Sequence, residues 1–375
     1  MEQVSQELRL SWEGDRHRSV VGFYYLNIDG DYDIDQSGDA FFGPGAVFGI
    51  ESTQETTTFA FFGQTEFDIT DQLSLTAGLR YNNDDKDFTL TSADFGFVGY
   101  TDNLSEDDFN AKIQLNYRVN DDWLIYGGYS RGIKSGGFNV PLTPVTTAEL
   151  PYIGEVLTAY EIGFKASLTE TTRLNASVYY YDYDDYQAYN IDPFFNALLF
   201  NAEAENYGAE IELVSNPIEG LDILLGASFL ETEVTGLPTT FNTLDPVTFA
   251  PAQNFPTGTE EAPLSPGATI NGLVRYSWPA FGGNVALQGD FRWTDDQKFN
   301  LAVSELVLED DYIVLNARLD YTSSDERWSA AIFMKNLTDT EYRVYSTDAT
   351  LFFGSGLDVW GNERWVGGNV RYNFF

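Results

Sequence analysis

The 375-residue sequence contains no cysteine and a single histidine. Without cysteine the chain has neither a thiol nucleophile nor a thiolate metal site. The histidine, His17, lies between Arg16 and Arg18 in a short stretch that resembles a turn, whereas a hydrolase triad needs its imidazole beside a serine and a carboxylate. We therefore interpret His17 as an ordinary surface residue and expect no catalytic residue, no enzyme activity and no cofactor.

Positive charge is scarce, and long apolar runs are missing. Lys and Arg number 20 against 58 Asp and Glu, which gives a formal charge of −38 and argues against a nucleic-acid partner. No stretch approaches the roughly 18 apolar residues of a membrane-spanning helix, and the mean hydropathy is −0.25. These features exclude a helical membrane protein. They leave a transmembrane β-barrel open, because its strands carry their apolar residues in alternation.

The sequence also lacks a secretory signal and an internal linker. It starts Met-Glu-Gln-Val-Ser-Gln-Glu-Leu, with no basic region followed by an apolar stretch. No low-complexity tract or shift in composition divides it, so we expect one domain over residues 1–375. An exported protein without its signal would be a trimmed chain or a fragment.

The feature that the sequence does have is alternation with a period of two residues. Within residues 312–321, Ile313 and Leu315 fall on one face, and Asn316 and Arg318 fall on the other. This is the period of a β-strand, and helical spacing is not sustained over any comparable length. The pattern predicts fifteen strands, centred on residues 5–13, 18–29, 54–69, 72–86, 106–119, 122–132, 156–169, 172–187, 200–215, 220–234, 267–278, 283–296, 309–322, 326–338 and 361–375.

The connections between these strands alternate between short and long, seven of each. The short turns are Gly14–His17, Thr70–Asp71, Asn120–Asp121, Thr169–Thr171, Asn216–Glu219, Pro279–Gly282 and Ser323–Asp325, and the long connections are residues 30–53, 87–105, 133–155, 188–199, 235–266, 297–308 and 339–360. Outer-membrane barrels have short periplasmic turns and long extracellular loops. A soluble β-sandwich, the alternative, has no physical reason for so strict an asymmetry.

The two faces of the strands suit a membrane wall. Aromatic residues gather near strand ends, as in residues 179–183 and at Trp328 and Trp365, where the two membrane interfaces would place them. The opposite faces carry charged and amide side chains several residues deep, which a solid core could not hold cheaply. We therefore predict an all-β, antiparallel transmembrane barrel with a wet or plugged lumen.

Several motifs, in this order and spacing, resemble the C-terminal barrel of the TonB-dependent outer-membrane receptors. The resemblance covers essentially the whole chain and is carried by Ser5-Gln6-Glu7-Leu8-Arg9-Leu10, Tyr126-Gly127-Gly128-Tyr129-Ser130-Arg131-Gly132, Lys134-Ser135-Gly136-Gly137-Phe138-Asn139, Tyr160-Glu161-Ile162-Gly163-Phe164-Lys165, Asn206-Tyr207-Gly208-Ala209-Glu210-Ile211-Glu212, Lys335-Asn336-Leu337-Thr338-Asp339 and Val370-Arg371-Tyr372-Asn373-Phe374-Phe375. Family barrels have twenty-two strands, so these fifteen would be the eighth to the twenty-second. The plug domain, the TonB box and about seven strands would then be missing, and an open sheet would expose two edges.

The resemblance also implies a location, partners and a function. The chain would lie in the outer membrane of a Gram-negative bacterium, among lipid and lipopolysaccharide, with extracellular long loops and a periplasmic C-terminus. Tyr372, Phe374 and Phe375 would signal to the barrel assembly machinery, although Phe375 lies one residue beyond the apolar phase. The parent protein would import a scarce nutrient, most often a ferric siderophore, energised by the TonB complex through the missing plug. The alternative is a passive porin, which needs a closed barrel.

Two stretches are candidate binding sites. Asp33, Asp35 and Ser37, followed by Gly38, match the start of a Ca²⁺ loop, but Pro44 replaces the bidentate Glu at its twelfth position, so a solvated acidic loop is the preferred interpretation. Further acidic clusters predict a negative outer surface, which could bind divalent cations with lipopolysaccharide or reflect a saline habitat.

The second stretch opens the long connection at residues 133–155. Arg131 and Lys134 could attract an anionic ferric chelate there, with Phe138 and Asn139 beside them. We prefer to interpret these four residues as a strand exit and loop anchor, because exposed ion contacts are weak.

Overall fold

The computed structural model describes the chain except at residues 38–44, 46, 143–144, 192–196, 238–240, 245–250, 255–258, 303, 349, 351–354 and 375. Within the described part, helical structure is limited to one residue, Thr350, and three short 3₁₀ turns, η1 (Ala93–Phe95), η2 (Thr147–Glu149) and η3 (Glu305–Val307). No helix among these residues is long and apolar enough to cross a membrane.

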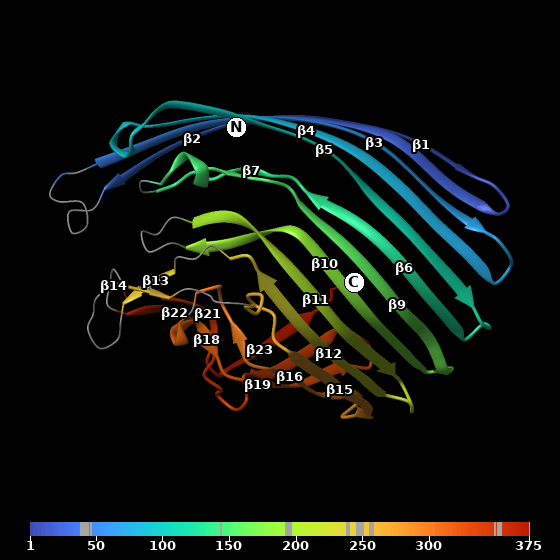
Figure 1. Cartoon of the computed structure of the whole chain (residues 1–375). Helices are drawn as coiled ribbons and strands as arrows, with labels where there is room; N and C mark the ends of the chain where they lie inside the picture. Colours follow the sequence, from blue (N-terminus) through green and yellow to red (C-terminus); the bar gives the residue numbers. More distant parts are fainter. Residues whose placement is uncertain are drawn as a thin grey trace.

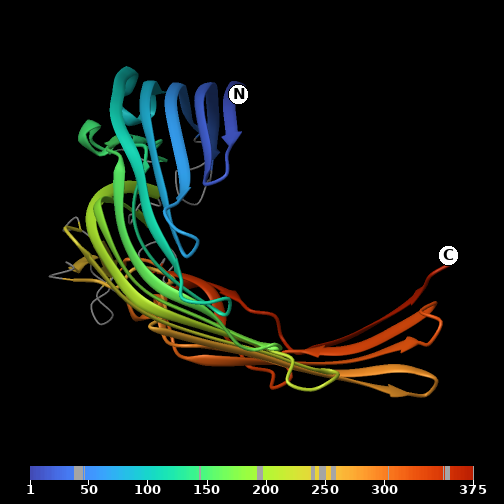
Figure 2. The same cartoon turned by 90° about the vertical axis from the view of Figure 1, so that its right-hand side faces the viewer.

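Fifteen antiparallel strands of the described chain form one curved, open sheet, in which each strand pairs with the next (Figures 1 and 2). They are β1 (Glu2–Glu13), β2 (His17–Ser37), β3 (Val47–Asp68), β4 (Leu73–Ser92), β5 (Phe97–Arg118), β6 (Trp123–Lys134), β9 (Glu155–Thr169), β10 (Thr172–Ile191), β11 (Ala197–Ser215), β12 (Leu221–Thr235), β15 (Ala268–Ala280), β16 (Gly283–Thr294), β19 (Tyr312–Ser323), β20 (Trp328–Lys335) and β23 (Trp365–Tyr372). The predicted all-β class and the strand count are confirmed.

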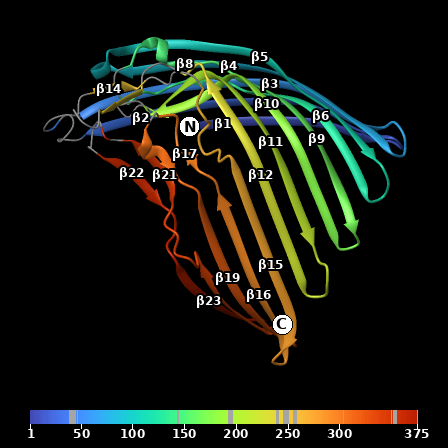
Figure 3. The ribbon, with the colours of Figure 1, turned by 60° about the horizontal axis from the view of Figure 1, so that its bottom comes forward.

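Short and long connections lie at opposite ends of the sheet, which we call the short-turn end and the long-loop end (Figure 3). The long-loop end carries four small two-stranded sheets in the described residues. They are β7 (Gly137–Phe138) with β8 (Pro151–Tyr152), β13 (Phe241–Leu244) with β14 (Pro251–Asn254), β17 (Gln297–Lys298) with β18 (Leu308–Glu309), and β21 (Arg343–Asp348) with β22 (Gly356–Trp360). Apolar side chains are buried at this end, including Ile50, Phe88 and Leu150 in one cluster and Val234 and Leu301 in another.

Strands β2 to β5 are longer than predicted. Residues 30–53 and 87–105 were expected to be long loops, but β2 pairs with β3 out to Ser37 and Val47, and β4 pairs with β5 out to Ser92 and Phe97. The expectation was wrong because it followed apolar alternation alone. Beyond the apolar segment the same alternation continues with acidic residues on one face, and the backbone ladder does not depend on side-chain polarity.

The main sheet has one apolar face and one polar face. Leu79, Ile162 and Leu319 project, exposed, from the middle of the apolar face. On its long-loop side, cross-strand pairing aligns aromatic residues in two rows, Phe23–Phe61–Tyr81–Phe109 and Tyr129–Tyr160–Tyr180–Tyr207. On its short-turn side lie Trp12, Tyr117, Trp123, Tyr276, Trp278, Trp328 and Tyr372. An apolar band between two aromatic girdles is the surface that a bilayer requires.

Candidate functional site

Three carboxylates lie together on the polar face. Glu161 is on β9, and Glu210 and Glu212 are on β11. Ser177 of β10 pairs with Gly163 on one side and with Glu210 on the other, so the alternation of the strands directs all three carboxylates to the same face. They line a depression of about 500 Å³. We call these three residues the carboxylate patch.

Two glycines and a tyrosine shape this depression. The hydroxyl of Tyr126 donates a hydrogen bond to Oε1 of Glu161 at 2.6 Å. A Cβ atom on Gly163 would lie 2.6 Å from that hydroxyl oxygen, and one on Gly226 would lie 2.8 Å from Oδ1 of Asn271. Any larger residue at either position would displace these polar groups, so the glycines keep the depression open.

No cation of the described chain lies within 4.0 Å of a carboxylate oxygen of the carboxylate patch. Asp320, on the same face, is paired instead: it is 3.2 Å from Nη1 of Arg275 and 2.7 Å from Nη2 of Arg318. Three uncompensated carboxylates suit a water-filled space or a cationic surface.

Arg131 lies on β6 and pairs with Ala111 of β5, which is where the backbone pairing of these two strands ends. Its guanidinium donates two hydrogen bonds to Asp108, at 2.7 Å to Oδ1 and 3.1 Å to Oδ2, which is the bidentate geometry of strong arginine–carboxylate pairs. It also lies over the ring of Phe109, 4.4 Å from its centre. The guanidinium is therefore already engaged within the chain.

The other three predicted binding residues follow in the next connection. Nζ of Lys134 is 3.9 Å from Oε2 of Glu155, and the lysine side chain is 58% exposed. The ring of Phe138 is buried and stacks on Phe88 with their centres 4.6 Å apart. Lys134 and Phe138 are close in sequence, but only the side chain of Lys134 reaches solvent.

Asn139 is buried and fully hydrogen-bonded. Its Nδ2 donates to the carbonyl oxygens of Glu149 and Leu199 at 2.9 and 2.8 Å, and its Oδ1 accepts from the amide of Leu199 at 2.9 Å. These are the contacts of a loop anchor. A role of Arg131, Lys134, Phe138 or Asn139 in binding substrate stays a prediction.

A second anchor was missed by the sequence analysis. Beyond the last backbone pair of β5 and β6, the side chain of Glu106 supplies the hydrogen bonds. It accepts from the amides of Gly136 at 2.8 Å and Gly154 at 2.6 Å. Lys86 donates to the Ser135 hydroxyl and to the Gly136 carbonyl. One carboxylate and one ammonium thus hold both ends of the connection between β6 and β9.

Period-two alternation could have identified this anchor. Glu106 and Asp108 share the polar face, whereas Asp107 lies on the other face and accepts from the hydroxyl of Tyr81 at 2.7 Å. From the sequence alone, residues 106–108 are instead interpreted as one of the acidic surface clusters. Lys86 lies beyond the apolar segment, and burial lowers the pKa of its ammonium while Asp84 and Glu106 act in the opposite direction.

The calcium candidate has no support from the geometry of its described residues. Asp33, Asp35 and Ser37 lie on the extended strand β2, where alternate residues are about 6.6 Å apart, whereas a calcium loop curls its oxygens around one ion at about 2.4 Å. Gly38 and Pro44 fall outside the described residues. Within the described chain, no group of three or more Asp, Glu or His residues is placed to hold a metal ion.

The remaining predicted residues lie at the short-turn end. His17 is the first residue of β2, and its carbonyl oxygen accepts from the amide of Gly14 at 2.9 Å. Tyr372 ends β23 on the apolar face. The centre of its ring is 4.7 Å from that of Trp328 and 4.9 Å from that of Phe374. Phe375 lies outside the described residues, so its part in an assembly signal stays a prediction.

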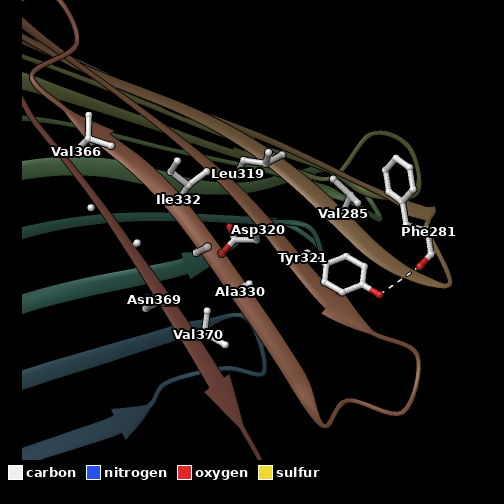
Figure 4. Close-up of a pocket in the computed structure, with 13 residues that line it drawn as sticks. Phe281, Val285, Leu319, Asp320, Tyr321, Ala330, Ile332, Val366, Asn369 and Val370 are labelled. Carbon is white, nitrogen blue, oxygen red and sulfur yellow. Dashed lines mark hydrogen bonds between the residues drawn. The ribbon is translucent and has the colours of Figure 1, made fainter.

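An apolar depression of about 920 Å³ lies near the C-terminal edge (Figure 4). Leu319, Ile332 and Val366 project to the same side from β19, β20 and β23, and the Tyr321 hydroxyl donates to the carbonyl of Phe281 at 3.2 Å. These three apolar side chains belong to the apolar face, so this depression suits hydrocarbon rather than a polar solute.

Acidic residues crowd the apolar-face side of the strands beyond the aromatic rows. Asp182, Glu205 and Glu233 are direct cross-strand partners on β10, β11 and β12. Burial and the neighbouring Asp184 and Glu205 raise the pKa of Asp182. These three carboxylates therefore form an acidic row across three neighbouring strands.

Comparison with known proteins gives the chain a family. Residues 2–337 match the family model described as "TonB dependent receptor-like, beta-barrel". The pesticin receptor of Yersinia pestis is 24% identical over 381 aligned residues, which cover 99% of this chain and 51% of that protein. The ferric-pyoverdine 358 receptor of Pseudomonas putida is 23% identical, with 88% of this chain and 39% of that protein covered.

The fold agrees with that of solved receptors. The crystal structure of the ferric yersiniabactin uptake receptor FyuA from Yersinia pestis aligns with a TM-score of 0.80 and 20% identity, covering all of this chain and 54% of that one. The chain thus spans about half the length of the relatives that it matches.

Proposed function

The chain belongs to the TonB-dependent receptor family through its β-barrel. From this premise we propose that it forms the outer-membrane wall of an importer for a chelated metal, namely iron bound to a siderophore. The apolar band between two aromatic girdles carries this proposal. The named relatives are receptors for pesticin, ferric pyoverdine and ferric yersiniabactin. The wall itself does no chemistry.

The long-loop end would then face the outside, and the polar face would line the lumen. Outer-membrane barrels have long extracellular loops, and the anchored connections would form the vestibule where substrate binds. Energy would reach the substrate through TonB and a plug, because a wall of hydrogen-bonded strands has no moving part of its own.

The carboxylate patch gives the lumen a defined partner. Three uncompensated carboxylates on a wall that encloses a plug would pair with Arg or Lys side chains of that plug. The structure of the wall thereby supports a plugged importer over a diffusion porin, whose lumen needs no such complement. In the described sheet β1 and β23 each have a single neighbour, so these residues by themselves form no closed pore.

The test is transport and plug binding. Cells whose only receptor is the parent protein should take up a ferric siderophore in a TonB-dependent manner, and cells with the 375-residue chain alone should not. A stable conductance of the purified chain in planar bilayers would instead favour the porin.

A charge variant probes the lumenal partner. The triple variant Glu161→Gln/Glu210→Gln/Glu212→Gln should weaken binding of the parent's plug domain, measured by calorimetry, by at least about tenfold. The matched control Glu203→Gln/Glu205→Gln/Glu233→Gln removes the same charge from the opposite face and should leave the affinity unchanged. Equal affinities for both variants would contradict the assignment of the patch.

A further inference from the structure

Cations are nearly absent from the long-loop end. The seven long connections predicted from the sequence hold three Lys or Arg residues, Lys134, Lys298 and Arg343, against nineteen Asp or Glu. All 20 Lys and Arg residues of the chain lie within its described residues. The positions and partners of every cation are therefore known.

Each of the three cations in these connections already has a carboxylate partner. The pairs are Lys134 with Glu155 at 3.9 Å, Lys298 with Glu260, and Arg343 with Glu309 at 2.6 Å and with Asp358 at 3.6 Å. Lys298 and Arg343 are also largely buried, with side chains 13% and 18% exposed. An approaching anion would have to compete with these carboxylates.

Three cations next to the connections are engaged as well. Arg131 is held by both oxygens of Asp108, Lys86 is bound to Ser135 and Gly136, and Arg364 is 3.3 Å from Asp339. Arg292 and Lys335 have no ion pair among the described residues; both lie on the polar face, Arg292 two residues before the end of β16 and Lys335 at the end of β20.

Several carboxylates at the long-loop end form no ion pair within the described chain. Asp31, Asp33 and Asp35 project from β2 as exposed side chains and form no ion pair with the described chain. The row of Asp182 and Glu205 with Glu233 adds to them on the far strands. These carboxylates share the phase of the apolar face, so they surround the mouth from its outer side. Summed over this rim, such charges set up a potential of several kT that reaches past single contacts.

Resting on the proposed function, we propose that the compound received at this mouth is a neutral or cationic metal complex, and that polyanionic chelates are excluded. Electrostatic attraction changes association rates by roughly 10- to 1,000-fold, and like charge acts in the opposite sense. A polyanionic catecholate or citrate complex would meet repulsion, and the one well-exposed cation in the connections, Lys134, already lies 3.9 Å from Glu155. A trihydroxamate complex carries no such excess of negative charge.

The experiment compares two iron complexes of similar size and opposite charge. The purified 375-residue chain in lipid nanodiscs is mixed with cationic ferrioxamine B or with polyanionic ferric enterobactin, and quenching of the intrinsic tryptophan fluorescence reports association; the chain has 7 Trp. The cationic complex should associate at least about tenfold faster at low salt. The difference should shrink at high salt, where the Debye length falls to about 3 Å.

A matched pair of variants localises the effect. Asp31→Asn/Asp33→Asn/Asp35→Asn at the long-loop end should reduce the preference for ferrioxamine B. The control Asp15→Asn/Asp71→Asn/Asp121→Asn removes three charges from exposed turns at the short-turn end and should preserve it.

Two outcomes separate this inference from the function on which it rests. Ferric enterobactin associating as fast as ferrioxamine B at low salt would overturn the inference and leave the importer intact. Quenching by neither complex would count against the importer function itself, and the inference would fall with it.

Discussion

At the scale of residues, glycine decides how the connection between β6 and β9 folds. A Cβ atom on Gly136 would lie 2.5 Å from the carbonyl oxygen of Tyr152 and 2.8 Å from a methyl group of Leu104. The small β7–β8 sheet approaches the wall closely at this point. The close packing therefore explains why glycine stands in this part of the connection, without any contact to a substrate.

Replacing Gly136 with alanine should open this connection. The added methyl group cannot be accommodated without moving backbone, so limited proteolysis should cleave within residues 133–155 faster than in the unmodified chain. Gly132→Ala is the matched control, because a Cβ atom there meets nothing within 4 Å. Equal cleavage of the two variants would show that the close approach does not hold the connection.

Arg131 and Lys134 should differ sharply although both are cations in the same stretch. Losing the bidentate pair of Arg131 with Asp108, whose side chains are 18% and 27% exposed, should cost about 1.5–3 kcal/mol. The longer and more exposed pair of Lys134 should be worth about 0–1 kcal/mol. Urea unfolding of Arg131→Gln and Lys134→Gln measures both, and a larger loss for Lys134→Gln would refute this ranking.

At the scale of elements, period-two alternation located all fifteen strands because each places apolar residues toward one face. Where the apolar face ends, acidic residues replace the apolar residues of the alternating pattern, but the strand continues. Asp31, Asp33 and Asp35 alternate with Tyr32 and Ile34 as regularly as any membrane segment. Strands that continue into water keep their backbone pairing, and only a pattern of acidic alternation marks them.

The outer halves of β2 and β3 should therefore behave as sheet. Amides of residues 31–37 and 47–53 should exchange hydrogen more slowly than those of the nearby turn at residues 93–96, because ladder pairing protects backbone amides. Hydrogen exchange followed by mass spectrometry compares these segments directly. Equally fast exchange in all three segments would show that residues 30–53 form a loop, as the sequence first suggested.

The residues that anchor the long connections were harder to predict from the sequence than the strands. Glu106 and Lys86 act through backbone groups of residues about 30 to 50 positions away, and no local motif records such a partner. The carboxylate patch lay within the quoted family motifs, yet its lack of counterions emerges only when neighbouring strands are placed side by side.

At the scale of the whole molecule, charge and polarity divide the sheet into zones. The apolar band lies between two aromatic girdles, the polar face carries the carboxylate patch, and the long-loop end is acidic with almost all of its cations engaged. Each zone suits one surrounding: hydrocarbon, a filled lumen and the outside medium. The account depends most on the orientation of these zones in the outer membrane.

The absence of cysteine makes that orientation directly measurable. Val98, 80% exposed at the long-loop end, and Asp71, fully exposed at the short-turn end, can each be changed to a single cysteine without background labelling. In intact cells that carry the exported chain, a bulky membrane-impermeant maleimide should label Val98→Cys. It should label Asp71→Cys only after the outer membrane is opened. Labelling of Asp71→Cys alone in intact cells would contradict the account.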